Sequence, residues 1–159
     1  MSLSIYFAAP LFTQAELDFN ERVCGLLEEE GHDVFLPQRD GLESDTLSEE
    51  KGAEDAMQEI FELDRKNVLD ADLVTATLDG RVPSEGVCVE MAFAYDHDIP
   101  VIALKTDRRT FGFREEYNAM LYGLFEEKVD SPKNSSPQSN STTSKLGQRF
   151  DGTCPTNTE

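Results

Sequence analysis

The sequence contains little of several residue types that mark common functions. Its 159 residues include no tryptophan, three cysteines and two histidines. The cysteines, Cys24, Cys88 and Cys154, are far apart and form no Cys-x-x-Cys pair or Cys/His cluster. Structural zinc sites need such closely spaced ligands, so we expect no metal site. A sparse and odd number of cysteines is typical of reduced thiols in a cytoplasmic protein.

Positive charge is also scarce. The chain has 14 basic and 32 acidic residues, which gives a formal net charge of −18. Such a surface repels nucleic-acid phosphates and anionic lipids, so we expect neither a nucleic-acid polymer nor a membrane as partner. No apolar run reaches the length of a membrane-spanning helix, and the first residues lack the basic segment of a signal peptide. We therefore expect a cytoplasmic protein.

The order of the predicted elements indicates an α/β protein. Strands are predicted at 3–9, 34–36, 72–79 and 100–104, and helices at 13–30, 53–69, 84–96 and 114–125. The polar segment 38–55 is predicted to be a mobile loop that passes into a helix near Ser48. Strands that alternate with helices form a parallel sheet with right-handed crossovers. We expect a doubly wound, flavodoxin-like parallel sheet of four to five strands, with helices on both faces.

The composition changes near residue 129. Residues 131–144 are polar and of low complexity, so they cannot bury enough apolar surface to offset the entropy lost on ordering. We therefore predict one folded domain over residues 1–128 and a disordered polar tail over 129–159.

Glu90 stands in a helix that is otherwise apolar. The stretch 87–95 is apolar on almost every side, which predicts burial, and a glutamate is rarely buried without a partner or a task. The alternative is a glutamate at an opening of the core, near solvent. Because Glu90 lies in the first turns of its helix, the helix dipole favours the ionised carboxylate, which suits a nucleophile.

Asp64 falls on the apolar stripe of the preceding helix, four residues from both Ile60 and Val68. A salt bridge to Arg65 or Lys66 is the alternative, but adjacent residues do not face each other on a helix. Burial raises the pKa of a carboxyl that points to the core, and a raised pKa suits a general acid. Two carboxyl groups with different tasks are typical of enzymes that break glycosidic bonds.

Tyr6 is predicted near the end of the first strand. A lone aromatic residue there is most simply part of the core. A buried tyrosine hydroxyl nevertheless needs a hydrogen-bond partner, and the Glu90 carboxylate is our candidate for it.

These residues lie in segments whose order and spacing resemble the nucleoside 2-deoxyribosyltransferase family. The matching segments are 5–13, 60–64 with 71–72, 78–80, 86–92, and 111–114 with 118–120. The resemblance implies cleavage of the N-glycosidic bond of 2′-deoxynucleosides through a covalent deoxyribosyl ester on Glu90. The sugar then passes to another nucleobase. The expected partners are thus a deoxynucleoside or deoxynucleotide and a nucleobase, with no cofactor.

The resemblance also implies roles for individual residues. Glu90 is the nucleophile, Asp64 is the acid near the departing base, and Tyr6 is the hydroxyl that contacts the nucleophile. Substrate contacts are expected from Ala8, Phe12, Gln38, Asp79, Ser84, Gly86 and Asn118. Family members form oligomers built from dimers, so we expect a homodimer or higher oligomer in which Asn118 reaches a neighbouring site.

Position 84 departs from the transferase pattern, which commonly has aspartate six residues before the nucleophile. Related 2′-deoxynucleoside 5′-phosphate N-hydrolases have serine there and use it on the phosphate, so Ser84 keeps a monophosphate hydrolase as the alternative. The neighbouring Glu85 disfavours a phosphate, and a simple helix cap is another interpretation of Ser84. Family members also usually end in a further packed strand or helix, which the sequence after Val129 does not predict.

A non-catalytic signalling or nucleotide-binding module is the alternative from another functional class. Lys105, at the end of the fourth predicted strand, fits a receiver domain. A receiver needs acids after its first strand to hold Mg²⁺, whereas this chain has the apolar segment 8–10 there. No Gly-x-Gly-x-x-Gly motif follows a predicted strand, which disfavours a flavin or dinucleotide.

Overall fold

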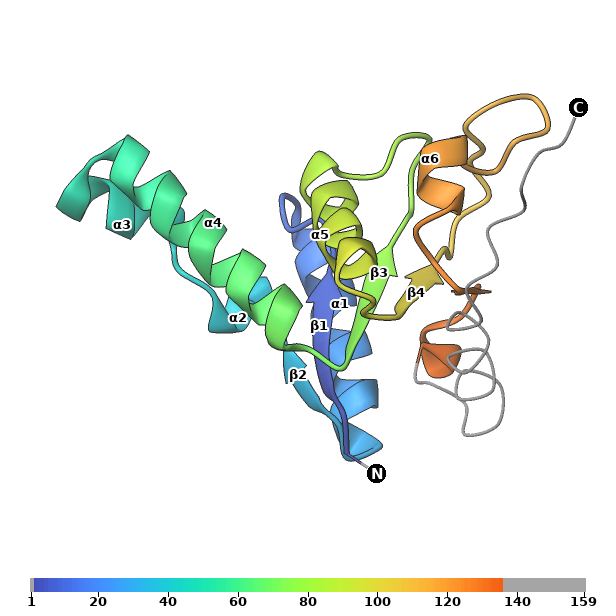
Figure 1. The fold of residues 1–159 in the computed structure, drawn as a ribbon, viewed down its shortest axis with the longest axis horizontal. Helices are drawn as coiled ribbons and strands as arrows, with labels where there is room; N and C mark the ends of the chain where they lie inside the picture. The colour runs from blue at the N-terminus through green and yellow to red at the C-terminus, as the bar shows by residue number, and fades with distance from the viewer. Residues whose placement is uncertain (1, 136–159) are drawn as a thin grey trace, which may run out of the picture.

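The computed structural model describes residues 2–135, and its centre is a single parallel sheet (Figure 1). The strands are β1 (Ser4–Ala8), β2 (Asp33–Phe35), β3 (Leu73–Thr77), β4 (Val101–Leu104) and β5 (Glu127–Val129). Their order is β2-β1-β3-β4-β5, and every neighbouring pair is parallel. This order changes direction between β1 and β3, where doubly wound sheets bind ligands. The predicted flavodoxin-like α/β fold is confirmed.

Three long helices cover the two faces of the sheet (Figure 1). One face carries α1 (Gln14–Glu29), and the other carries α4 (Ala53–Asp70) and α5 (Glu85–Asp96). Within residues 2–135 no helix has the length and apolarity needed to span a bilayer.

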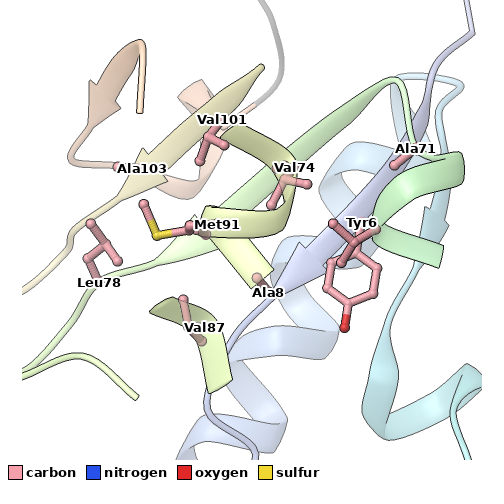
Figure 2. Close-up of a cluster of buried hydrophobic side chains, with 12 residues drawn as sticks. Tyr6, Ala8, Ala71, Val74, Leu78, Val87, Met91, Val101 and Ala103 are labelled. Atoms are coloured by element: carbon pink, nitrogen blue, oxygen red, sulfur yellow. The ribbon is translucent and has the colours of Figure 1, made fainter. Parts of the chain in front are cut away.

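Alternation along β1 decides which side chains reach which face, because successive residues of a strand point to opposite sides. Ile5 and Phe7 pack in the core cluster that includes residues of α1. Tyr6 and Ala8 pack in the other cluster, together with Met91 and further residues of α5. Figure 2 shows this second cluster, with side chains from α5, β1, β3 and β4. Tyr6 therefore faces the helix that carries Glu90.

The start and end of α1 follow the signals in the sequence. The Thr13 hydroxyl accepts a hydrogen bond from the Glu16 N–H (3.3 Å), and the Glu16 carboxylate accepts one from the Thr13 N–H (2.8 Å). This reciprocal pair is the predicted capping box. Shortly after the helix, Gly31 has φ +91°, a conformation that glycine adopts without steric cost.

The segment predicted to be a mobile loop is largely helical. It contains α2 (Pro37–Asp40) and α3 (Ser44–Lys51), so the prediction for residues 38–55 is wrong in its first part. These helices have no apolar stripe that the sequence could reveal, because their side chains face solvent or bond to one another. Thr46, for example, donates a hydrogen bond to Glu43. Gly52, with φ +92°, separates α3 from α4. In Figure 1, α3 and the first turns of α4 project beyond the sheet.

The helix predicted at 114–125 is also much shorter. Only α6 (Ala119–Tyr122) is helical. Asn118 starts it by accepting a hydrogen bond from the Met120 N–H at 2.8 Å, and the residues before it form other contacts. Glu116, for example, binds Lys128 of β5. Tertiary contacts to the sheet edge thus replaced the earlier helical turns.

The chain continues the fold beyond residue 129. β5 pairs with β4, and a short 3-10 helix, η1 (Pro132–Asn134), follows it. Ser135 is fully buried and its carbonyl accepts from Thr75. The further packed strand that the sequence did not predict is therefore present, and the expectation of disorder is wrong for 129–135. The rest of the predicted tail, 136–159, lies outside the described residues.

Candidate active site

Two cavities share Glu85, at the start of α5. The smaller, about 270 Å³, lies between α4 and α5 and is called here the Glu90 cavity. Its walls are formed by Phe61, Asp64, Arg65, Glu85, Gly86, Val89, Glu90 and Phe93. The larger, about 610 Å³, is called the Ser84 cavity and involves the carboxyl end of β3 and the residues before α5. Carboxyl ends of parallel strands are where this fold binds ligands.

Glu90 is held by the tyrosine that the sequence indicated. The fully buried Tyr6 hydroxyl donates a 2.9 Å hydrogen bond to Glu90 Oε1. Burial raises the pKa of Tyr6, and the charges of Glu90 and Asp64 raise it further, so the phenol remains protonated and donates. No other hydrogen bond to the Glu90 carboxylate is formed within residues 2–135, which leaves Oε2 open to a reaction partner.

The helix dipole was expected to keep Glu90 ionised, but burial has the larger effect and favours the neutral carboxyl. Desolvation raises the pKa of Glu90 to about 7, against the lowering effect of the Tyr6 hydrogen bond. The neighbouring Asp64 charge adds to the rise. Glu90 lies in the second turn of α5, beyond the terminal turn over which the dipole acts. Both of its protonation states are consequently accessible near neutral pH.

Asp64 reaches the same cavity from α4. It is partly buried, and among the described residues it has no hydrogen bond or ion pair, so the alternative of a salt bridge to Arg65 or Lys66 is wrong. The Arg65 guanidinium instead lies 5.7 Å from the centre of the Phe93 ring. Desolvation raises the pKa of Asp64 to about 6. Asp64 can therefore carry a proton in slightly acidic solution, as a general acid must.

Two aromatic residues in this cavity were not singled out from the sequence. Phe61 and Phe93 meet edge to face, with ring centroids 6.0 Å apart. Phe61 lies three residues before Asp64 and Phe93 three residues after Glu90, so each shares a helix face with its carboxylate. That spacing was the available signal. The pair gives the two carboxyl groups an apolar wall that suits a planar ring.

Replacement of Tyr6 by phenylalanine tests the hydrogen bond to Glu90. We expect turnover to fall about ten- to a hundredfold, the usual effect of losing a hydrogen bond to a charged group. Because this bond lowers the pKa of Glu90, the acidic limb of the pH–rate profile should move to higher pH. Steady-state rates from pH 5 to 9 measure both effects. Tyr95→Phe, at an exposed tyrosine near the end of α5, is the control, and an unmoved acidic limb in Tyr6→Phe would contradict the assignment.

The Ser84 cavity contains three of the predicted substrate contacts, Phe12, Asp79 and Ser84. Ser84 precedes α5, but its side chain forms no capping hydrogen bond, so the interpretation of Ser84 as a simple cap is wrong. The Thr77 hydroxyl, on a residue that is 3% exposed, also lines this cavity and has no partner in the described part of the chain. Two hydroxyl groups are thus free to bind a polar ligand.

Three other predicted contact residues are placed differently. Gly86 lines the Glu90 cavity, whereas Ala8 is fully buried in the core below α5. The Gln38 amide is bonded to α1: it donates to the Leu17 carbonyl (3.1 Å) and accepts from Asn20 (2.9 Å). In this structure Gln38 therefore ties α2 to α1, and a role for Ala8 or Gln38 toward substrate stays a prediction.

Asn118 lies in the wall of a third, mainly apolar cavity of about 300 Å³. Its side-chain oxygen caps α6, and Met120 beside it is 78% exposed. Asn118 shares neither the Glu90 cavity nor the Ser84 cavity of its own chain. A role for Asn118 in the site of a neighbouring subunit stays a prediction.

The family is decided by a comparison of sequences. The model of the family described as nucleoside 2-deoxyribosyltransferase matches residues 5–135, which is most of the chain. The chain belongs to the nucleoside 2-deoxyribosyltransferase family. Membership makes it an enzyme that transfers glycosyl groups or cleaves N-glycosidic bonds, with nucleosides and nucleobases as the substrate class. Among curated proteins, none matches the chain.

Solved structures share the fold of this nucleoside 2-deoxyribosyltransferase family member. A conserved protein from Enterococcus faecalis V583 is 30% identical, with a TM-score of 0.70 over 94% of this chain and 100% of the other. A 2-deoxyribosyltransferase from Bacillus psychrosaccharolyticus is 21% identical, with a TM-score of 0.70 and coverage of 90% and 95%. A CMP N-glycosidase from Clostridium botulinum is 20% identical, with a TM-score of 0.53 and coverage of 82% and 92%.

Proposed function

We propose that this protein cleaves the N-glycosidic bond of 2′-deoxynucleosides through a covalent deoxyribosyl-Glu90 intermediate and transfers the sugar to another nucleobase. One observation carries the proposal: Glu90, bonded to Tyr6, and the unpaired Asp64 line the same cavity. Their environments give them separable tasks, which is the arrangement that glycoside chemistry requires.

The steps follow from these two groups. Glu90 Oε2 attacks C1′ and forms an ester bond as the bond from C1′ to the base nitrogen breaks. Asp64 gives its proton to the departing base, so no anionic base is released. In the second half, a nitrogen of the acceptor base attacks C1′, its proton returns to Asp64, and the Glu90 carboxylate leaves. The Tyr6 hydrogen bond steadies the carboxylate in both halves.

The charges around the Ser84 cavity favour a substrate with an uncharged 5′ group. Glu16, Asp79 and Glu85 line this cavity, and the one arginine there, Arg109, forms an ion pair with Asp107. Carboxylates repel a dianionic phosphate but accept hydrogen bonds from a hydroxyl. This balance supports nucleosides over nucleoside monophosphates as substrates.

A specific observation keeps the 5′-monophosphate N-hydrolase as a second candidate. The Ser84 hydroxyl does not cap α5 and points to no partner within residues 2–135. It lies at the start of α5, where the free N–H groups and the helix dipole favour an anion. In this alternative, water resolves the same Glu90 ester.

We also propose that the protein forms a homodimer or higher oligomer in which Asn118 reaches a neighbouring site. Large apolar side chains are exposed around it: Phe113 is 97%, Met120 78% and Tyr122 69% exposed. Such a patch is typical of a protein interface. Because Asn118 uses its oxygen for the α6 cap, its NH₂ group remains free to donate to a ligand.

Product analysis distinguishes the two candidate reactions. The protein is incubated with deoxyinosine and adenine, and separately with deoxyinosine 5′-monophosphate, and the products are separated by chromatography. We expect deoxyadenosine in the first reaction and little release of base in the second. Free hypoxanthine and deoxyribose 5-phosphate in the second reaction would support the hydrolase instead. Absence of products in both, with Glu90→Gln protein as the blank, would contradict the proposed function.

A further inference from the structure

Lys105 is a buried ammonium group that takes no part in the proposed reaction. It follows β4, and the residue is only 4% exposed. Its Nζ donates to the carbonyls of Leu78 (3.1 Å) and Gly80 (3.2 Å) and to Asp107 Oδ1 (2.7 Å). An ammonium has three donors, so all of them are used. Lys105 does not line the Ser84 cavity or the Glu90 cavity.

Its partners connect the ends of β3 and β4. Asp107 accepts a 2.8 Å hydrogen bond from the Gly80 N–H, so the peptide groups on both sides of Gly80 are held by one ion pair. Burial alone would raise the pKa of Asp107, but hydrogen bonds from Lys105, Gly80 and Arg109 lower it to about 2. Asp107 is therefore ionised at physiological pH and accepts these hydrogen bonds as a carboxylate.

Gly80 has a backbone conformation that a residue with a side chain could not adopt without strain. Gly80 has φ +107°, and a Cβ there would lie 3.2 Å from the Val82 carbonyl oxygen. A second set of bonds runs the opposite way: the Asp79 carboxylate accepts from the Thr106 N–H (2.6 Å) and the Thr106 hydroxyl (2.6 Å). The loop after β3 and the loop after β4 thus hold each other.

A third loop reaches the same ammonium. The ring of Tyr117 lies with its centroid 5.8 Å from Lys105 Nζ, within the range of a cation–π contact. Tyr117 precedes Asn118, the residue proposed to serve a neighbouring site. One buried side chain therefore contacts the segments that carry Asp79, Ser84 and Asn118.

We propose that Lys105 is a positioning residue that sets the two loops lining the Ser84 cavity, after β3 and after β4, and the loop that precedes Asn118. The inference rests on the proposed function. Glu90 is positioned independently of Lys105, by Tyr6 on β1 and by the packing of Val87 and Met91. Loss of Lys105 therefore weakens substrate binding while the reaction at C1′ continues, so KM rises and kcat stays close to its original value.

The test compares Lys105→Met with Lys128→Met. Lys128 is a matched control because its Nζ lies 6.0 Å from the same Tyr117 ring, yet it is partly exposed and bonds only to Glu116 in the described structure. For Lys105→Met we expect KM for deoxyinosine to rise about tenfold, the equivalent of one lost hydrogen bond, with kcat within about twofold. Lys128→Met should leave both constants unchanged. An equal fall in kcat, or an unchanged KM, would overturn the proposal.

Hydrogen exchange separates this proposal from the proposed function, because it needs no substrate. In Lys105→Met the amides of residues 78–84 and 105–109 should exchange about tenfold faster, while those of β1 and α5 keep their protection. Unchanged exchange in the loops would overturn the proposal even if the protein is an active transferase. Lost protection throughout the sheet would also overturn it, because Lys105 would then support the fold as a whole.

Chemical rescue of a cavity variant tests whether the charge of Lys105 is required, or only its volume. Lys105→Ala removes the three methylene groups and the amine beyond Cβ, and n-propylammonium replaces them. We expect Lys105→Ala to raise KM. Added n-propylammonium should lower this raised KM, whereas 1-propanol, a neutral compound of the same size, should not. Equal rescue by both compounds would overturn the role assigned to the charge.

Should Lys105→Met not fold, Asp107→Asn breaks the ion pair from the other side and is expected to loosen the same two loops.

Discussion

Replacement of Glu90 by glutamine is expected to lower the rate of N-glycosidic bond cleavage by about 10⁴-fold. Glutamine can still accept the hydrogen bond from Tyr6, but its neutral amide is a poor nucleophile and forms no stable ester with C1′. Initial rates with deoxyinosine measure the loss. Glu62→Gln, at an exposed glutamate on the outer part of α4, is the control and should retain full activity.

A trapping experiment identifies the attacking atom directly. A 2-fluorinated deoxynucleoside slows breakdown of the ester, so the intact mass of the wild-type protein should increase by one fluorinated sugar. Peptide mapping should place the added mass on Glu90, and Glu90→Gln protein should show none. Label on another residue, or full turnover by Glu90→Gln, would rule out the proposed nucleophile.

The same substitution should change stability in a pH-dependent way. The pKa of Glu90 is raised by burial from 4.5 to about 7, so the folded state favours the neutral carboxyl. This stabilisation is fully present below about pH 4.5 and is lost as the pH rises through about 7. Glutamine cannot ionise. The variant should therefore melt at a higher temperature than the wild type at pH 8, with a smaller difference at pH 5, as thermal denaturation curves would show.

Replacement of Asp64 by asparagine is expected to lower turnover about a hundred- to a thousandfold, the usual contribution of a positioned general acid. The loss should be largest for bases that leave poorly as anions, because those depend most on protonation. Rates with a series of deoxynucleosides of different leaving ability measure this trend. Equal losses across the series would argue against an acid role and would leave Asp64 as a binding residue.

The pH profile gives a second test of Asp64. Turnover requires ionised Glu90 and protonated Asp64, whose pKa values are about 7 and about 6. The wild-type profile should therefore be a narrow bell with its maximum in that interval, its limbs belonging to the coupled pair. In Asp64→Asn the alkaline fall should disappear.

Much of the site could be predicted because it consists of residues that violate a local pattern. Glu90 interrupts an apolar helix and Asp64 interrupts an apolar stripe, so periodicity alone indicates that both point inward. Tyr6 needed a partner for its hydroxyl, and the alternation of β1 directs it to α5. The elements around these residues have strong local signals, such as the Thr13 capping box.

The errors arose where contacts distant in sequence override local preference. The segment 38–55 looked like a polar loop, yet it contains α2 and α3. Residues 114–118 looked helical, but Glu116 accepts hydrogen bonds from Lys128 of β5 and the Tyr117 ring contacts Lys105, which follows β4.

By itself the sequence determined the periodicity of each element, the inward direction of the two carboxyl groups and the parallel, doubly wound class of the sheet, because these depend on residues a few positions apart. Only the tertiary structure decided that Asp64 and Glu90 line one cavity and that burial outweighs the helix dipole at Glu90. It also decided that Lys105 joins three loops. Distances between segments and the loss of solvent arise only when the helices pack on the sheet, and no local pattern encodes them.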